Sequence, residues 1–432
     1  MKPITPFTFL VILGLTSCST FDVGVERSPA PQATSASTVT ATRMPSPDPA
    51  PTFTATPTET PYAPQPVPPT QVWPLEVARV LPAPLYYLSD VQGSRQIWRV
   101  EIDGSKSTMI TDLPQPVDAY DISSATGRLA YISNNQLFIS DALGHDPQLI
   151  DTQNEDLPGW YGGFIAWSPD GTRLAFTGQH SVWLYEVGEK NLRQILAVPA
   201  ENPFPDVLTL TSRTPWSPDG QTLLVSSLSG DWGEVNYLSL DRSTSLIQIG
   251  LSVCDEIRWS LDSRTLYGSR HTLYGPCDTP GLRRWDMLSH SLTPLIESES
   301  ITPTQHVLAR FVQAAQEAPD GALYYFYGSA DLLYSDTKGT LFMVRSARDG
   351  VTERQALRSD PYTDLYEVLW ASDMSAVAVV EGYPAGSFGA WNSSMGTIKF
   401  LTTDNKPVLF GSSRPPLVVA GRGCELRWGK AE

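Results

Sequence analysis

The chain has 432 residues, of which 41% are hydrophobic and 18% are charged, and its formal net charge at pH 7 is −16. Such an acidic chain repels the phosphate backbone of nucleic acids, which excludes these polymers from the expected partners. After residue 72 the composition is that of a globular protein, and about 350 residues suit one large domain. We therefore predict a single folded domain over residues 73–432, which carries almost all of the net charge.

Residues 1–17 have the features of a bacterial export signal. Lys2 precedes an apolar run from Ile4 to Leu15, and the segment leads into Cys18 through Leu15-Thr16-Ser17. This ending resembles the bacterial lipobox, in which the cysteine becomes the lipidated first residue of the mature protein. We predict a lipoprotein signal peptide over 1–17 and a membrane anchor on Cys18. The alternatives are an ordinary signal peptide with a chance cysteine and an uncleaved anchor, although the run is short for a membrane span.

Residues 18–72 are predicted to form a disordered linker behind the lipidated cysteine. The part from Ser28 to Thr70 consists largely of Pro, Thr, Ser and Ala, with few apolar residues that could build a core. An extended chain of this composition holds the following domain away from the membrane. A ligand for proline-binding domains and a scaffold for O-glycans are the alternative interpretations.

The predicted domain contains a repeated segment. Ala166–Phe176 reads AWSPDGTRLAF, and Pro215–Val225 reads PWSPDGQTLLV. Self-similarity at a spacing of about 40 to 50 residues indicates stacked structural units. Weaker copies bring the number of units to seven, with the tryptophan or its replacement at Ser123, Trp167, Trp216, Trp259, Glu317, Trp370 and Trp428.

Each repeat predicts a β-hairpin followed by two more strands. Pro, Asp and Gly in the SPDG segment favour a tight turn between two short β-rich stretches. We expect Asp170 and Asp219 to cap these turns rather than to act chemically, and the tryptophans to pack between units. His180–Val187 and Arg193–Val198 then supply a third and a fourth strand. Four short strands per unit are typical of a propeller blade.

The repeats resemble the TolB-type, WD-repeat-like β-propeller family over about residues 80–430. The resemblance implies an all-β fold of seven blades, with six or eight as alternatives. Leu85–Thr111 supplies only three strands, and the C-terminal segment CELRW supplies one. We therefore expect the C-terminal strand to join the N-terminal blade and to close the ring, which removes free sheet edges. The family's architecture carries many functions, so the fold alone predicts none of them.

In this family, one face of the disc is built from the loops that lead into each innermost strand and from the loops between second and third strands. In this chain those loops mix acids with aromatic residues, which are favoured in recognition surfaces. We expect a site there for a sugar, a cationic group or a partner protein, unless the loops form only a solvated acidic rim. The candidate residues are Trp160, Tyr161, Trp232, Asp255, Glu256, Tyr274, Tyr362, Asp364, Tyr383 and Glu425.

Catalytic interpretations have less support. The chain has no G-x-S-x-G motif, and its five histidines show no metal-ligand spacing; these are His145, His180, His271, His290 and His306. We predict a monomeric, non-catalytic recognition or scaffold module without cofactor or metal, anchored by lipid at the outer face of a cell-envelope membrane, with a protein or glycan partner. The alternative is a propeller enzyme acting on saccharides, of the lyase or hydrolase type, with its site in the central channel.

Three cysteines remain for disulfide chemistry outside the cytoplasm. Cys254 and Cys277 are expected at the same face of one blade, and a bond between them would close a loop of about 23 residues. A bond from Cys254 to Cys424 is the alternative, but it must cross the channel. We therefore expect a Cys254–Cys277 disulfide and a buried free thiol at Cys424.

Overall fold

The computed structural model describes one compact unit of the chain, within Arg79–Glu432. The predicted signal peptide, Cys18 and the linker lie outside the described residues. No helix long and apolar enough to cross a membrane was found in the part of the chain that is described. All regular elements there are β-strands. The described residues are 80–150, 165–178, 180–197, 207–210, 214–229, 232–241, 246–252, 255–270, 280–301, 306–332, 340–362, 365–382, 395–403 and 417–431.

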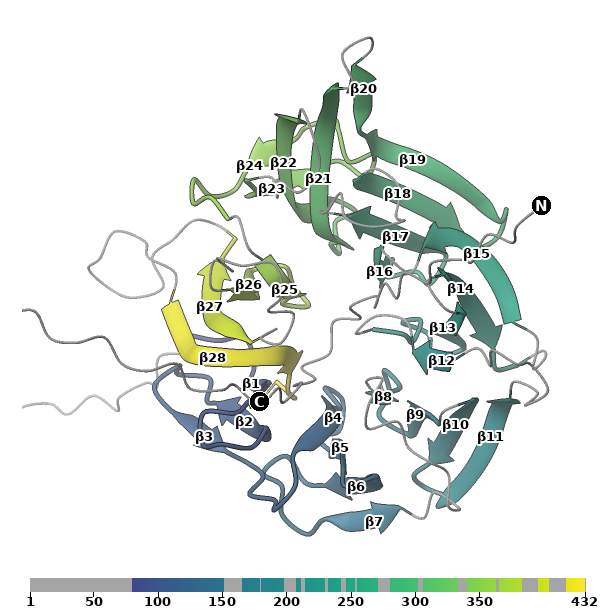
Figure 1. Ribbon diagram of the computed structural model, residues 1–432, viewed down its shortest axis with the longest axis vertical. Helices are drawn as coiled ribbons and strands as arrows, with labels where there is room; N and C mark the ends of the chain where they lie inside the picture. The colour runs from purple at the N-terminus through teal and green to yellow at the C-terminus, as the bar shows by residue number, and fades with distance from the viewer. Residues whose placement is uncertain are drawn as a thin grey trace, which may run out of the picture. The chain divides into compact units, whose positions relative to one another are not determined.

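The strands form antiparallel sheets that follow one another in chain order around a common centre (Figure 1). Four sheets have four strands each: β4 (Val117–Ile122), β5 (Leu129–Ser133), β6 (Gln136–Ser140) and β7 (Gln148–Ile150); β8 (Ile165–Trp167), β9 (Arg173–Thr177), β10 (Ser181–Glu186) and β11 (Asn191–Ala197); β12 (Val207–Leu210), β13 (Thr222–Ser229), β14 (Trp232–Ser239) and β15 (Leu246–Ser252); and β16 (Glu256–Trp259), β17 (Thr265–Arg270), β18 (Gly281–Asp286) and β19 (Ser291–Glu297). This agrees with the predicted unit of four strands.

Two larger sheets complete the arrangement. One has five strands, β20 (Glu299–Ile301), β21 (His306–Glu317), β22 (Leu323–Leu332), β23 (Phe342–Ser346) and β24 (Gln355–Ala356). The other has seven strands in the order β25-β26-β27-β28-β1-β2-β3, made of β25 (Leu365–Trp370), β26 (Ala376–Glu381), β27 (Gly396–Thr402), β28 (Leu417–Trp428), β1 (Leu85–Ser89), β2 (Gln96–Val100) and β3 (Ser107–Met109).

The strand β28 joins the two ends of the described chain. Its first half pairs with β27, from Phe400 opposite Leu417 to Gly396 opposite Gly423. Its second half pairs with β1, where Leu85 lies opposite Trp428 and Leu88 opposite Cys424. Figure 1 shows β28 between β27 and β1. One strand therefore serves as the last strand of β25–β28 and as the first strand of the group that continues through β1, β2 and β3.

The repeated SPDG segment forms the turn between the first and second strands, as predicted. In the turn between β8 and β9, the Ser168 hydroxyl donates to Asp170, and the same carboxylate accepts the backbone N–H of Thr172. Ser217 and Asp219 repeat the arrangement. The prediction that these aspartates cap turns is confirmed. Gly171 takes a φ of +68°, and a β-carbon there would lie 2.4 Å from the Ser123 hydroxyl oxygen of the neighbouring turn.

The repeated tryptophans lie between sheets, also as predicted. The Trp216 indole Nε1 donates to the Ala166 carbonyl oxygen at 3.0 Å, and Trp370 donates to Ala314 at 2.7 Å. Each indole is buried and reaches a strand of another sheet, β8 for Trp216 and β21 for Trp370. Since an indole adds a large apolar area and one donor, each tryptophan contributes packing and a directed bond at the same place. The repeat thus specifies how one sheet docks on the next.

Candidate functional site

The strands nearest the centre carry a short motif that recurs. Glu256–Trp259 reads EIRW and Glu425–Trp428 reads ELRW, while Glu367–Trp370 reads EVLW. Because side chains alternate along a strand, the Glu and Arg share one side and the apolar residue and Trp share the other. Leu426 and Trp259 are buried accordingly. The motif therefore places a packing residue and a charged pair on opposite sides of the same strand.

The charged pair of β16 contacts β25. The Arg258 guanidinium lies 2.6 Å from the Glu256 carboxylate, measured from Nη2 to Oε1. The same nitrogen donates to the carbonyl oxygen of Val368 at 2.6 Å. Charge-assisted bonds of this kind are stronger than bonds between neutral groups. Arg258 thus joins two sheets that are far apart in the sequence.

The strand β28 makes polar contacts with its neighbours in both directions. Arg427 Nε donates to Asp121 Oδ1 of β4 at 3.0 Å, and Asp121 Oδ2 accepts the backbone N–H of Trp167 at 2.7 Å. On the other side, the backbone N–H of Leu426 donates to Glu367 Oε1 at 2.5 Å. Burial raises the pKa of Asp121, and Arg427 opposes that shift. These contacts hold β4, β8, β25 and β28 together at the centre.

A second buried ion-pair cluster lies at the start of β16. Asp255 Oδ1 accepts from Arg270 Nη2 at 2.8 Å and from Arg283 Nη1 at 3.2 Å. The side chains of Asp255 and Arg270 are each 1% exposed. Asp255 Oδ2 accepts the backbone N–H of Ser252, and the Asp255 N–H donates to the Ser252 carbonyl. The Asp255 carboxylate therefore bonds two arginines of the sheet β16–β19 and the end of β15 in the preceding sheet.

The structure places four of the predicted face residues. Asp255 is buried as described, and Tyr362 is 2% exposed in a core cluster, with its ring edge-to-face against Phe326. Glu256 remains 27% exposed beside Arg258, and Glu425 is half-buried with a φ of +53°. Trp232 begins β14, but its side chain is not described. Five more lie outside the described residues: Trp160, Tyr161, Tyr274, Asp364 and Tyr383.

Sequence reasoning missed the arginine and aspartate at the centre. Arg258, Arg427 and Asp121 form ion pairs there, and none of them lies in a loop of the predicted face. The recurrence of E-x-R-W was the available signal, because two strands with the same charged pair and the same tryptophan are expected to occupy equivalent places. The candidate site is therefore the central group of Glu256, Arg258, Glu425, Arg427 and Asp121, which we call the central charged group.

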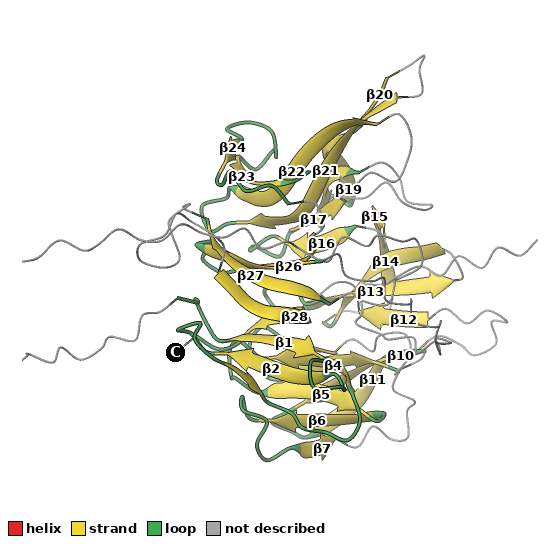
Figure 2. Ribbon diagram, turned by 60° about the vertical axis from the view of Figure 1, so that its left-hand side comes forward, coloured by secondary structure: helices red, strands yellow, loops and turns green. Residues whose placement is uncertain are grey.

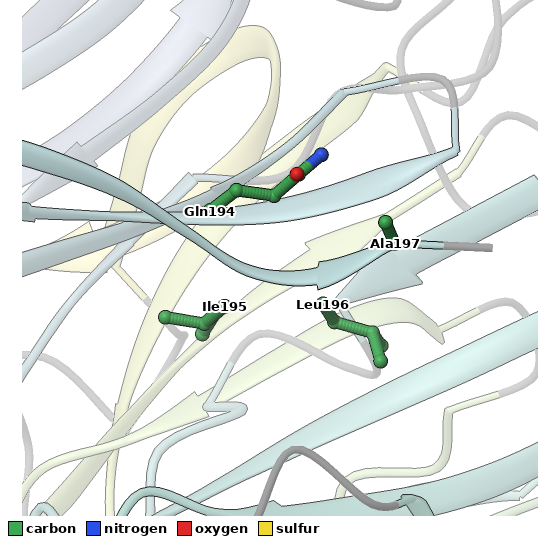
Figure 3. Close-up of a pocket in the computed structure, with 4 residues that line it drawn as sticks. All are labelled: Gln194, Ile195, Leu196 and Ala197. Carbon is green, nitrogen blue, oxygen red and sulfur yellow. The ribbon is translucent and has the colours of Figure 1, made fainter.

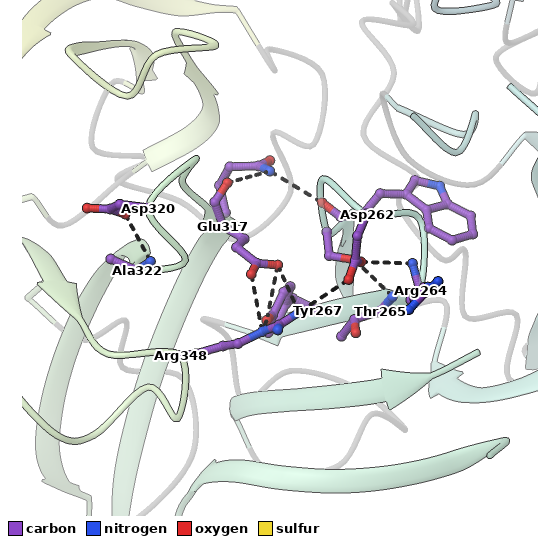
Figure 4. Close-up of polar contacts among 11 residues, drawn as sticks. Asp262, Arg264, Thr265, Tyr267, Glu317, Asp320, Ala322 and Arg348 are labelled. Atoms are coloured by element: carbon purple, nitrogen blue, oxygen red, sulfur yellow. Dashed lines mark hydrogen bonds and ion pairs between the residues drawn. The ribbon is translucent and has the colours of Figure 1, made fainter. Parts of the chain in front are cut away.

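A polar cluster occupies the position where one repeat has lost its tryptophan. Glu317 replaces the indole and is 8% exposed (Figure 4). Its carboxylate lies 3.1 Å from Arg348 Nε, and that nitrogen also donates to the Tyr267 hydroxyl at 3.2 Å. Burial raises the pKa of Glu317, and the Arg348 guanidinium opposes that shift. This cluster joins the sheets β16–β19 and β20–β24 where other neighbours are joined by an indole.

The cysteine predictions need one correction. Cys424 is 3% exposed and is disulfide-bonded, so the expectation of a free thiol there is wrong. Its partner lies outside the described residues. Cys254 and Cys277 also lie outside them, and the expected bond between these two stays a prediction. The expectation of a free thiol rested on the distance across the channel between Cys254 and Cys424.

Two of the histidines make local contacts within the described residues. His145 pairs with Asp141 in an exposed turn, and His290 stacks on Trp285 at the outer edge. Within the described ranges, no group of three or more His, Cys, Asp or Glu residues could hold a metal ion.

A hollow of about 270 Å³ lies along β11 and is lined by Gln194, Ile195, Leu196 and Ala197. There a bulge turns Ile195 and Leu196 to one side of the strand (Figure 3). Bulges of this kind blunt sheet edges against pairing with other chains.

No protein-family profile and no curated protein matches the chain. Solved structures are similar in fold. A prolyl endopeptidase superposes with a TM-score of 0.51 and 9% identity over 81% of this chain and 49% of that chain. An oligogalacturonate lyase in complex with manganese gives a TM-score of 0.50 and 12% identity over 78% of this chain and 84% of that chain.

The fold is that of a β-propeller. TolB from Acinetobacter baumannii is also similar, with a TM-score of 0.40 and 11% identity over 81% of this chain and 65% of that chain. The present propeller spans about half the length of the endopeptidase. At these identities the likeness concerns the fold alone, because one propeller architecture carries many unrelated sites.

Proposed function

We propose that this protein is a lipid-anchored, extracytoplasmic β-propeller that acts as a non-catalytic recognition or scaffold module for a protein or glycan of the cell envelope. The lipid on Cys18 and the linker over 18–72 would hold the propeller at a distance from the membrane. Seven blades are proposed, because the seven-stranded sheet divides at β28 into two groups of four that share this strand.

The observation that carries the proposal is the bonding of the central charged group. Two of its acids are paired with arginine, in Glu256–Arg258 and Asp121–Arg427. A guanidinium stays protonated at neutral pH, so neither arginine of the group can serve as a proton acceptor in general acid–base catalysis. Within the central charged group, Glu256 and Glu425 remain partly exposed, at equivalent positions on β16 and β28. Such fixed charges suit binding of a partner that presents hydroxyl or cationic groups.

The test is binding to a glycan array and to envelope proteins, with the mature lipoprotein purified from membranes. We expect a ligand whose binding falls at least fivefold in Glu425→Gln and Glu256→Gln. Glu297→Gln, which removes the same charge from the exposed outer strand β19, should bind as the wild type does. Equal binding by all four proteins would contradict the assignment to the central charged group. Turnover of a saccharide, with metal in the purified protein, would instead favour the enzyme alternative.

A further inference from the structure

Four junctions between neighbouring groups of strands are closed by an indole. In each of them a tryptophan Nε1 donates to a backbone carbonyl oxygen of the preceding group: Trp216 to Ala166 at 3.0 Å, Trp259 to Pro215 at 3.4 Å, Trp370 to Ala314 at 2.7 Å and Trp428 to Trp370 at 2.9 Å. Separation of such a junction exposes a large ring to water and breaks its directed bond.

The junction between the sheets β16–β19 and β20–β24 lacks this bond within the described residues. Glu317 occupies the tryptophan position there. The Gln316 Nε2 donates to the Trp259 carbonyl oxygen at 3.3 Å, so an amide on a flexible side chain takes the place of the indole. In the described part of the chain, the buried apolar residues between the two sheets include no tryptophan; they are Tyr267, Leu282, Ile296, Val312, Ala315, Leu323, Tyr325 and Val344.

The bonds that cross this junction are polar, and water reaches them (Figure 4). Arg348 Nε donates to the Tyr267 hydroxyl at 3.2 Å, and Arg348 Nη2 lies 3.9 Å from Asp262 Oδ2. The Tyr267 hydroxyl donates to Glu317 Oε2 at 3.4 Å. The side chains of Arg348 and Asp262 are 46% and 50% exposed. Ion pairs exposed to this extent contribute little to stability, because solvent screens them.

The junction between β28 and β4 also lacks the tryptophan, which Ser123 replaces, but it is closed in another way. Arg427 Nε donates to Asp121 Oδ1 at 3.0 Å, and these two side chains are only 11% and 13% exposed. The Tyr120 hydroxyl donates to the Glu425 carbonyl oxygen. Breaking a buried ion pair leaves charges without partners and costs far more than breaking an exposed pair. The two junctions are therefore not equivalent.

We propose that the ring opens in the native protein at the junction between β16–β19 and β20–β24, which we call the polar seam, while the strands on both sides stay paired. The polar groups of the seam can exchange their bonds for bonds to water. Separation there therefore costs less than at a junction that is closed by an indole. Native proteins open locally where buried apolar contacts are few.

Opening of the polar seam exposes the strand β16, which carries Glu256 and Arg258. The Arg258 bond to the Val368 carbonyl reaches β25, which follows the sheet β20–β24 in chain order. This bond spans the inner end of the seam, so it breaks when β16 moves away from β21 and β25. Opening then gives a partner access to Glu256 from the side of β21. This last step rests on the proposed function, whereas the opening itself does not.

Thiol labelling of cysteine variants of the full-length lipoprotein tests the opening. Ala315→Cys places a thiol among the apolar residues of the polar seam, and Ala175→Cys is the matched control in the cluster of Trp216; the two alanines are 1% and 0% exposed. Tryptic peptides 311–338 and 174–190 contain no native cysteine, so peptide masses identify the new thiols. We expect iodoacetamide to label position 315 at least about tenfold faster than position 175 in native buffer.

Urea distinguishes opening of the seam from unfolding of the whole chain. Opening exposes little surface, so labelling at position 315 should change little in low urea, whereas labelling through global unfolding rises steeply. Equal rates at the two positions, or a steep dependence on urea at position 315, would overturn the proposal. Val312→Cys, equally buried in the same cluster, gives the same comparison if Ala315→Cys does not fold.

Arg348→Gln tests whether polar bonds hold the seam closed. It removes the bonds to Tyr267 and Asp262 and should speed labelling at position 315 about three- to tenfold, with no change at position 175. Arg345→Gln is the matched control and should change neither rate, because Arg345 pairs with Asp320 within its own group of strands at 2.9 Å. Acceleration by Arg348→Gln at both positions, or at neither, would contradict the proposal. Glycan and protein binding is measured separately, so a failure of the proposed function is distinguishable.

Discussion

Replacement of Trp216 by Phe tests how the repeated tryptophans join the blades. The change removes the indole N–H that donates to the Ala166 carbonyl at 3.0 Å and keeps an aromatic ring in the same place. It also weakens the stacking of Arg173 on this ring, whose centroid lies 5.1 Å from the guanidinium carbon. Leaving a buried carbonyl without its donor costs about 1–3 kcal/mol.

Trp167→Phe is the matched control. Trp167 occupies the same position in the preceding repeat and is equally buried, but within the described residues its Nε1 has no hydrogen-bond partner. The two substitutions remove similar apolar area, so their difference reports the hydrogen bond together with the stacking of Arg173. We expect Trp216→Phe to be the more destabilising by about 1–3 kcal/mol. With about 350 folded residues this corresponds to roughly 1.5–4 °C in Tm.

Urea denaturation followed by circular dichroism gives the free energy of unfolding of both variants, provided that refolding is reversible. A loss in Trp167→Phe equal to or larger than that in Trp216→Phe would refute the reasoning. The tryptophans would then act through their apolar area alone, and the repeat would specify packing without a directed bond.

Three further predictions address the anchor, the closing strand and pH. Cys18→Ser should release the protein from membranes or leave it unprocessed, and a processed variant that still sediments with membranes would contradict lipidation. Deletion of Cys424–Glu432 removes the partner of β1 and should abolish the cooperative melting transition, whereas Cys424→Ala keeps the strand and should retain one. Burial raises the pKa of Glu317, so the folded state binds more protons and the free energy of unfolding falls as pH rises above about 4.3 through the raised value. Glu317→Gln should reduce this fall, while Glu297→Gln should not, and identical pH profiles would contradict the assignment.

The repeat predicted the strands well because its signals are local. The SPDG turn, the capping by Asp170 and the packing of Trp216 follow from a few neighbouring residues, and the structure confirms them. The pairing of Cys424–Trp428 with Leu85–Leu88 was also predictable, because each segment was short of strands that the other could supply.

The candidate site was less predictable because it depends on contacts distant in sequence. Loop position suggested that Asp255 and Tyr362 were available to a ligand, but Asp255 turns inward to Arg270 and Arg283, and Tyr362 packs against Phe326. None of these three partners is marked by spacing or composition in the sequence. The same holds for Arg258, whose carbonyl partner Val368 is 110 positions away. Cys424 illustrates the opposite error, because an assumed distance led to the expectation of a free thiol at a cysteine that is disulfide-bonded.

The sharing of β28 between two groups of strands has a consequence for the order of folding. Ser89 and Arg422, which are hydrogen-bonded to each other, are 333 positions apart, so the group that contains β1 stays incomplete until the last part of the chain arrives. Contacts this distant make folding slow, since a long loop must close before they form. A chain delivered with its N-terminus first would expose the edge of β1 throughout, and an exposed edge pairs readily with other chains. The pairing of Cys424–Trp428 with β1 is therefore the step that covers this edge.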